Sequence, residues 1–228
     1  MKLSSLPREE VLRYLGWKGT AVPLPLEAVL ERCMEEALGL CSPLVLYKRV
    51  PILLEEDRVK LLGTPYALEG KDIRAHLSSC GEIFLLCVTV GFAIEREIRA
   101  RMLTAPEEAV ILDACATAAV EEAADGAEGE IAAILQKEGR GLTWRYSPGY
   151  GDLPLETQKW LIPFMDAPRK IGLSLTDSLL MTPSKSVSAI LGVTRLPETG
   201  RESGGGKNPC QRCPNRETCS YRKRGDHC

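Results

Sequence analysis

The spacing of apolar residues predicts helices at the start of the chain and strands directly after them. Over residues 26–41 apolar side chains recur at i, i+3 and i+4, which is typical of an amphipathic helix with one buried face. A shorter helix is predicted over residues 7–16, because acidic residues occupy its first turn and a glycine ends it. Residues 44–62 then contain three predicted strands, LVLYKRV, PILLEE and RVKLLG, the last two joined by a turn at Glu56-Asp57.

The middle of the chain contains a continuous apolar run between two predicted helices. Residues 81–91, GEIFLLCVTVG, are bounded by glycines and suit a central strand covered on both faces. A helix is predicted before this strand, over residues 70–79. After the strand, residues 104–107 resemble a capping box that opens a long alanine-rich helix, which Gly126 and Gly129 are expected to interrupt.

The last part of the predicted domain returns to strand patterns. A short strand is predicted over residues 141–147 and a helix over residues 154–165. Residues 171–195 predict a hairpin with its turn at residues 182–185 and a buried last strand over residues 187–193. Because the elements do not alternate as βαβ units, the predicted class is α+β.

Composition narrows the functions that are expected. Among 228 residues, 29 basic and 31 acidic side chains give a formal net charge of −2, and aromatic residues make up 5%, which argues against nucleic-acid binding. The N-terminus is charged throughout and no apolar run approaches the ~18 residues that span a bilayer. A soluble cytoplasmic protein is therefore expected. No Gly-x-Ser-x-Gly or His-Glu-x-x-His motif is present, so these hydrolase chemistries are not predicted.

The nine cysteines fall into two groups. Five lie singly in apolar segments and are predicted to be buried thiols: Cys33, Cys41, Cys80, Cys87 and Cys115. The other four form the pattern Cys210-x2-Cys213-x5-Cys219-x8-Cys228, which suits an iron–sulfur cluster or zinc equally well. Because residues 197–209 are polar and glycine-rich, the predicted organisation is a domain over residues 1–196, a flexible linker, and a metal-binding tail over residues 210–228.

The stretch RYSPGYG, residues 145–151, is the strongest candidate for a binding site. Its arginine offers a planar set of donors that suits a carboxylate or a phosphate. Its proline and glycines fix a turn and let a ligand approach the backbone closely. From these residues alone, a plain connecting turn is an equally good interpretation.

Two segments together resemble a known family, the reactivation domain of cobalamin-dependent methionine synthase, which binds S-adenosylmethionine. RYSPGY, residues 145–150, matches that family's Arg-x-x-x-Gly-Tyr element. IGLSLTDS and MTPSKSVS, residues 171–178 and 181–188, are similar to its Gly-x-x-Leu-Thr-Glu-Ser and Met-x-Pro-x-x-Ser-Val-Ser stretch. The resemblance covers about residues 105–195. It implies a C-shaped α+β domain with a twisted antiparallel sheet flanked by helices.

The resemblance also implies roles for the matched residues. Arg145 is expected to bind the carboxylate of the methionine moiety, and the backbone from Ser147 to Gly149 to contact the nucleoside or the amino acid. Tyr150 is expected near the corrin edge, as the residue closest to the reaction. Two acids of the long helix are further candidates for the cofactor site: Glu122 and, behind it, Asp113.

The activity that the resemblance implies is reductive methylation, in which inactive cob(II)alamin regains a methyl group from S-adenosylmethionine after one-electron reduction. Because the cobalamin, folate and homocysteine modules are not in this sequence, a separate partner is expected to carry the corrinoid, either a methionine synthase or another corrinoid protein. Basic residues in the tail are candidates for docking a flavodoxin or ferredoxin. One alternative is a non-catalytic accessory module for a corrinoid protein that has lost S-adenosylmethionine binding. Another is a regulator that binds S-adenosylmethionine and whose tail recognises another protein.

Overall fold

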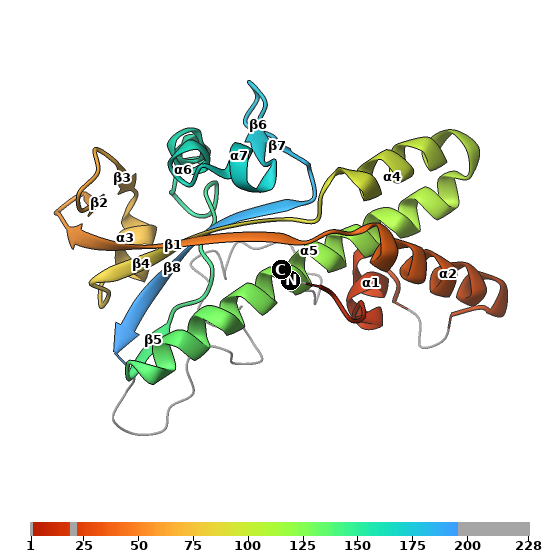
Figure 1. Ribbon diagram of the computed structural model, residues 1–228, viewed down its shortest axis with the longest axis horizontal. Helices are drawn as coiled ribbons and strands as arrows, with labels where there is room; N and C mark the ends of the chain where they lie inside the picture. Colours follow the sequence, from red (N-terminus) through yellow and green to blue (C-terminus); the bar gives the residue numbers. More distant parts are fainter. Residues whose placement is uncertain (1, 19–21, 196–228) are drawn as a thin grey trace. The chain divides into compact units, whose positions relative to one another are not determined.

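The protein contains two compact units, as a computed structural model describes them for residues 2–18 and 22–195. One unit is formed by the described residues up to 47 together with residues 86–130 and 161–188, and the other by residues 48–85, 131–160 and 189–195. Helices and strands follow one another without regular βαβ repeats (Figure 1). The predicted α+β class is therefore confirmed.

Six strands form the main sheet, in the order β3-β2-β1-β4-β8-β5. Their bounds are Leu44–Leu54 for β1, Arg58–Leu61 for β2, Ala67–Glu69 for β3, Glu82–Thr89 for β4, Arg140–Leu142 for β5 and Ser186–Arg195 for β8. The pairs β1–β2, β2–β3 and β5–β8 are antiparallel, with Ile52 opposite Leu61 and Gly141 opposite Thr194. The antiparallel sheet agrees with the prediction.

The apolar run over residues 81–91 forms the interior strand of the sheet, as its composition predicts. β4 lies between β1 and β8, and seven of its eight residues are buried. The middle of β8 is similarly buried, from Ser188 to Val193. Interior strands without alternation are expected where a sheet is covered on both faces.

Seven α-helices are present in the described part of the chain. Their bounds are Arg8–Tyr14 for α1, Leu24–Leu40 for α2, Lys71–His76 for α3, Phe92–Thr104 for α4, Pro106–Lys137 for α5, Gln158–Phe164 for α6 and Ala167–Ile171 for α7. A 3-10 turn over Leu155–Thr157 precedes α6. The predicted helices near residues 7–16, 26–41, 70–79 and 154–165 are confirmed, whereas α4 was not predicted.

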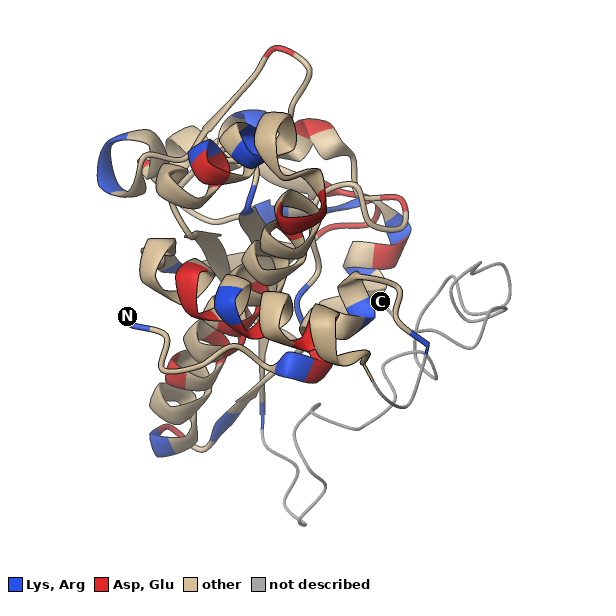
Figure 2. Cartoon of the chain, turned by 90° about the vertical axis from the view of Figure 1, so that its right-hand side faces the viewer, with Lys and Arg blue, Asp and Glu red and all other residues tan. Residues whose placement is uncertain are grey.

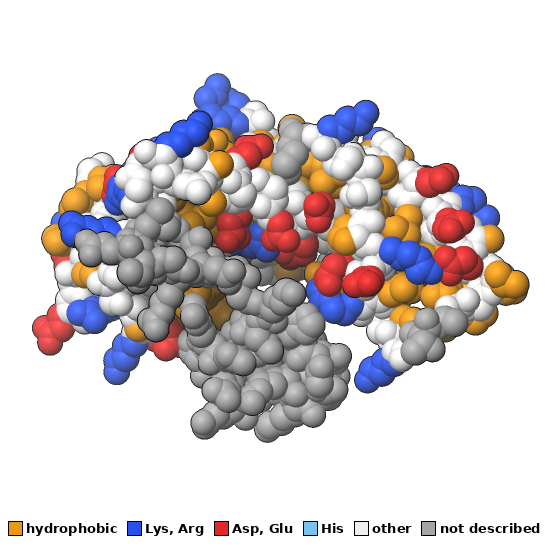
Figure 3. Space-filling view, turned by 90° about the horizontal axis from the view of Figure 1, so that it is seen from below, with side chains coloured by type: hydrophobic (Ala, Val, Ile, Leu, Met, Phe, Trp, Pro, Cys, Tyr) orange, Lys and Arg blue, Asp and Glu red, His pale blue; other side chains and the backbone are white. Residues whose placement is uncertain are grey.

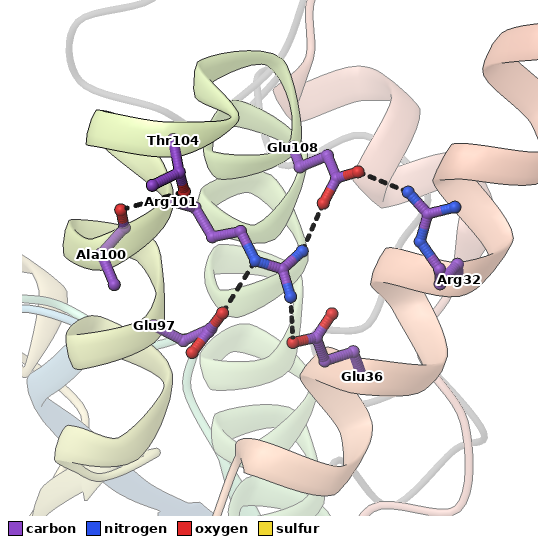
Figure 4. A network of polar contacts seen from close by, with 7 residues as sticks. All are labelled: Arg32, Glu36, Glu97, Ala100, Arg101, Thr104 and Glu108. Atoms are coloured by element: carbon purple, nitrogen blue, oxygen red, sulfur yellow. Dashed lines mark hydrogen bonds and ion pairs between the residues drawn. The ribbon is translucent and has the colours of Figure 1, made fainter.

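The sequence of α4 lacks the apolar spacing of an amphipathic helix, because ion pairs hold this helix more than a buried face does. Ile94 is its one residue that is fully buried. Arg101 contacts Glu97 of its own helix at 2.7 Å, Glu36 of α2 at 2.7 Å, and Glu108 of α5 (Figure 4). Glu108 also pairs with Arg32 of α2. This network joins three helices of the first unit through a single guanidinium.

The helix α5 is continuous over 32 residues, so the expected interruption at Gly126 and Gly129 is wrong. A glycine inside a helix costs about 1 kcal/mol relative to alanine. The neighbouring turn packs Ala123, Ala124 and Ala127 completely away from solvent. Burial of this small-residue face outweighs the local preference of the two glycines, since tertiary packing supplies most helical stability in proteins.

The predicted capping box at residues 104–107 is also wrong. Thr104 is the last residue of α4, and its hydroxyl donates a hydrogen bond back to the Ala100 carbonyl at 3.4 Å. The backbone N–H of Ala105 likewise bonds to the Arg101 carbonyl, at 2.8 Å. Thr104 therefore ends one helix, and α5 begins two residues later at Pro106, where a missing N–H has no cost.

The first two strands predicted between residues 44 and 62 are one strand, β1, which passes through Pro51. The Pro51 carbonyl accepts a hydrogen bond from the Leu62 N–H at 2.9 Å, so the strand keeps a ladder contact at the proline. The predicted turn at residues 56–57 is confirmed, because it joins the antiparallel strands β1 and β2.

The hairpin predicted near the end of the domain has its turn elsewhere. Its short strands are β6 (Ser174–Leu175) and β7 (Met181–Thr182), so the turn comprises residues 176–180 and not residues 182–185. The Thr176 hydroxyl accepts the Leu180 N–H at 3.1 Å, and Leu179 adopts a left-handed conformation with φ of 64°. A leucine gives no sequence signal for a left-handed turn residue, whereas Pro183 suggested a turn at residues 182–185.

The surface and the buried thiols agree with the composition. Acidic and basic residues are interspersed along the helices in Figure 2 and among apolar side chains on the face in Figure 3. The five singly placed cysteines are buried free thiols, as predicted. Among the described residues, no helix combines the length and the apolar character that crossing a membrane requires.

Candidate functional site

The stretch of residues 145–151 follows β5 and forms a tight turn anchored to the sheet. Tyr146 is almost completely buried and exchanges two backbone hydrogen bonds of 2.9 Å with Ile190 of β8. The turn is closed by hydrogen bonds from the Tyr150 N–H to the Ser147 carbonyl at 3.0 Å and from the Gly149 N–H to the Leu153 carbonyl at 2.9 Å. One end of the stretch is thus fixed by the sheet and the other by its own backbone.

The predicted binding residues on this turn reach the surface. Arg145 and Ser147 are half-buried, Gly149 is exposed, and the Tyr150 side chain is 37% exposed. Gly149 has a φ of +88°, a conformation that favours glycine and leaves its backbone uncovered. The turn therefore combines a half-buried arginine, an exposed glycine and a partly exposed phenol ring within six residues, a set that suits a ligand with a carboxylate and an apolar body.

Aromatic rings connect this turn to the helix α3. Tyr150 packs edge-on against Tyr146 with ring centroids 5.6 Å apart, and Tyr146 packs on His76 at 5.1 Å. His76 also meets the ring of Trp144 edge-on at 4.4 Å. These contacts place Trp144 and Tyr150, which are both more than one-third exposed, at the two ends of one ring cluster.

His76 is neutral and hydrogen-bonded in this cluster. Its Nε2 lies 3.1 Å from the Trp144 carbonyl and 2.9 Å from the Thr143 hydroxyl. The same hydroxyl accepts the Gly192 N–H of β8 at 2.7 Å. Burial lowers the pKa of His76 to about 4 and outweighs the hydrogen bond to Trp144, which acts in the opposite direction. The ring is a structural link and carries no charge near neutral pH.

The two candidate acids lie on the part of α5 that belongs to the first unit. Asp113 is exposed and forms an ion pair of 2.9 Å with the Lys185 ammonium group. Lys185 also bonds the Thr117 hydroxyl at 2.9 Å, and its side chain is only 17% exposed. Glu122 is exposed on the same helix. Asp113 thus already has a cationic partner from the second matched segment.

The second matched segment, residues 171–188, is held in the first unit by its own polar contacts. The Lys185 N–H donates to the Glu95 carboxylate of α4 at 3.0 Å, and the Lys185 carbonyl accepts the Val90 N–H at 3.2 Å. The Ser186 hydroxyl donates to the Pro183 carbonyl at 2.7 Å. The motif MTPSKSVS therefore forms the entry into β8.

The four tail cysteines Cys210, Cys213, Cys219 and Cys228 lie outside the described residues. Within the described ranges, no group of three or more histidine, cysteine or acidic side chains is placed to hold a metal ion. The prediction of a metal site in this protein consequently rests on the spacing of the tail cysteines alone.

Comparison with solved structures defines the class of this fold. The chain is similar to a crystal structure of the MetH reactivation domain bound to AdoHcy, with a TM-score of 0.58 and 15% sequence identity over 87% of this chain and 79% of that chain. Residues 122–195 match the family model of the vitamin B12 dependent methionine synthase activation domain. The resemblance in the sequence is therefore confirmed: residues 122–195 are similar to an activation domain, and the chain has the fold of a reactivation domain. No curated protein matched the sequence.

The matched segment contains both motifs and one of the two candidate acids. It includes residues 145–151 and 171–188, and it begins at Glu122, so Asp113 lies outside it. Sequence reasoning missed two side chains that hold the turn, Asp152 and His76, because their partners lie about seventy to eighty residues away along the chain. No local pattern signals contacts of that kind.

Proposed function

We propose that this protein binds S-adenosylmethionine and supports the reductive methylation of a cobalamin carried by a partner protein. The observation that supports the proposal most is the presence of both family motifs within residues 122–195, on a chain with the fold of a reactivation domain. The similar crystal structure holds AdoHcy, which is the demethylated form of the same donor. A methionine synthase or another corrinoid protein is the proposed partner.

The residues of the turn suit the methionine part of the donor. Arg145 supplies a guanidinium whose fork matches a carboxylate in a bidentate manner. Gly149 leaves backbone accessible at the surface, next to Ser147, and this allows close approach of a ligand. When bound, S-adenosylmethionine supplies an activated methyl group on a sulfonium. The role of the protein is then to hold the donor in a fixed orientation, with Tyr150 at the edge that faces the corrin.

The two acidic residues of α5 differ in how well their surroundings suit them to bind the cofactor. Glu122 is exposed and lies within the matched segment, so we propose it as the better candidate acid for cofactor binding. Asp113 already pairs with Lys185 and is the weaker candidate. We also propose that residues 210–228 hold an iron–sulfur cluster or zinc, and that a cluster there receives an electron from a flavodoxin or ferredoxin.

Calorimetric titration with S-adenosylmethionine tests the binding proposal. The unmodified protein should bind, and Arg145→Ala should bind about 10- to 100-fold more weakly, since a hydrogen bond to a charged group contributes roughly 1.5–3 kcal/mol. Arg145→Lys should recover part of the loss, because lysine keeps the charge without the fork. Lys159→Ala, at an exposed position on α6, is the matched control and should bind normally.

The reaction is tested by mixing the protein with a corrinoid-loaded methionine synthase, a low-potential reductant and S-adenosylmethionine. Formation of methylcobalamin should depend on both the donor and this protein. If the unmodified protein binds no S-adenosylmethionine and methylcobalamin does not form, the proposal fails and a non-catalytic accessory role becomes the better explanation.

A further inference from the structure

The carboxylate of Asp152, directly after the candidate turn, caps a helix that lies far away in the sequence. It accepts the Lys71 N–H at 2.6 Å and the Asp72 N–H at 3.0 Å, the first two N–H groups of α3. The residue that precedes the helix is Gly70, which has no side chain to perform this task. The segment that ends in Asp152 therefore replaces the local cap that most helices carry.

Neighbouring side chains pack so closely against two glycines at this point that neither glycine has room for a Cβ. Gly151 has a φ of +53°, and a Cβ there would lie 2.7 Å from the Asp72 carboxylate and would overlap the Tyr146 hydroxyl. A Cβ on Gly70 would overlap the Asp152 carboxylate in the same way. Gly70 thus lies against the residue after Gly151, and Gly151 lies against Asp72, close after Gly70. This close packing indicates that the junction has one arrangement.

The other end of α3 holds the other end of the same segment. His76, the last residue of the helix, lies within hydrogen-bonding distance of the Trp144 carbonyl and the Thr143 hydroxyl, just before Arg145. The candidate turn is thus attached to α3 on both sides, by Asp152 after it and by His76 before it. All of these residues belong to the second unit.

Helix capping alone does not account for this arrangement. A six-residue helix is a small element, and such helices are usually capped by a serine or aspartate directly before them, without a contact across 80 residues of sequence. What the long-range contact adds is a fixed position for the turn that carries Arg145. Binding to a preordered turn costs less conformational entropy, because the turn does not have to be ordered when the ligand binds.

We propose that Asp152 is a positioning residue for the S-adenosylmethionine site: its carboxylate fixes the Arg145–Gly151 turn on α3 before the donor binds. This inference rests on the proposed function, because it assumes that Arg145 binds the donor. Asp152 contacts no ligand itself and acts through the backbone of the turn.

The test compares three variants by calorimetry with S-adenosylmethionine and by hydrogen exchange of the backbone amides. Asp152→Ala should weaken binding about tenfold or more, because the turn must then be ordered at the moment of binding. Asp152→Asn keeps one of the two acceptor oxygens, so its loss of affinity should be smaller than that of Asp152→Ala. Asp57→Ala, at an exposed position in the β1–β2 turn of the same unit, should change nothing.

Hydrogen exchange separates positioning from general loss of stability. In Asp152→Ala the amides of Lys71, Asp72 and residues 145–151 should exchange faster, while those of β4 should exchange as before. Equal affinity of Asp152→Ala and the unmodified protein would overturn the inference, and so would unchanged exchange in the turn. Failure of the unmodified protein to bind S-adenosylmethionine would instead overturn the proposed function, and exchange would still decide whether Asp152 orders the turn.

Discussion

At the scale of single residues, His76 is a histidine whose neutral ring contributes to packing and hydrogen bonding. Its ring is packed against Trp144 and Tyr146, and its Nε2 shares contacts with a carbonyl and a hydroxyl. A positive charge in this place would lose hydration without gaining a carboxylate partner. Burial consequently lowers the pKa of His76 to about 4.

This shift predicts a specific dependence of stability on pH. In the unfolded chain His76 titrates near 6.5 and in the folded protein near 4, so between these values the unfolded state binds more protons. Stability should therefore fall as the pH drops from about 6.5 towards 4, and the His76 contribution should vanish above about 6.5. At pH 5 we expect a loss of about 1–2 kcal/mol relative to pH 7.5 from this residue, allowing for its partial exposure.

Urea unfolding at pH 7.5 and pH 5 measures this loss. His76→Gln retains a side-chain N–H donor but does not titrate, so its stability should change less between the two pH values. A second contribution from carboxylates with lowered pKa, such as Glu82 beside Arg49 and Arg140, belongs to lower pH. Equal pH dependence in His76→Gln and the unmodified protein would show that another group is responsible.

At the scale of elements, the helices differ in what the sequence reveals about them. α2 has regular apolar spacing and was predicted within two residues at each end. α4 contains five charged residues in thirteen and buries Ile94 fully, so its helical spacing of apolar residues is weak. Its position is set by Arg101 and three carboxylates from three helices, and such long-range pairing has no local signature.

The ion-pair network around Arg101 predicts that the packing of α4 against α2 and α5 depends on this one side chain. Arg101→Ala removes the cation and leaves Glu36, Glu97 and Glu108 close together, although the group is partly solvated. We expect a loss of about 1–2 kcal/mol in the free energy of unfolding, more than the value for an ordinary surface ion pair. Arg99→Ala, at an exposed position on the same helix, is the control and should change stability by less than about 0.5 kcal/mol.

Denaturant unfolding in low and high salt checks this assignment. The loss in Arg101→Ala should shrink when salt is raised, because screening weakens the repulsion among the remaining carboxylates. Adding Glu97→Gln to Arg101→Ala should recover part of the stability, whereas the same change in the unmodified protein should reduce it. Additive losses in the double variant would mean that the guanidinium does not couple these helices.

At the scale of the whole molecule, the sequence predicts the class and the interior strands better than the junctions. β4 and β8 were found from their apolar runs, and the α+β class from the order of elements. The turn at residues 176–180 was misplaced, because Leu179 adopts a left-handed conformation that glycine or asparagine usually signals. For the candidate site, the motifs predicted the turn at residues 145–151. Its attachment to α3 through Asp152 joins residues about eighty positions apart, so no local sequence pattern predicts it.

The cysteine-rich tail, residues 210–228, is the subject of the last prediction, which concerns metal binding and electron transfer. The spacing of Cys210, Cys213, Cys219 and Cys228 predicts one bound iron–sulfur cluster or zinc ion, since four thiolates complete either site. Cys210→Ser with Cys213→Ser should remove the metal, as elemental analysis and absorption spectra of anaerobically purified protein would show. Ser220→Ala, also within the tail, should keep it.

The same variants separate an electron relay from a docking role. If the metal is an iron–sulfur cluster in the relay, the double serine variant should bind S-adenosylmethionine normally but form methylcobalamin slowly with a flavodoxin or ferredoxin donor. A small chemical reductant that reaches the corrinoid directly should restore its rate. Zinc in the purified protein, or equal rates with the protein donor, would exclude the relay, because zinc has no redox chemistry and serves structure or docking alone.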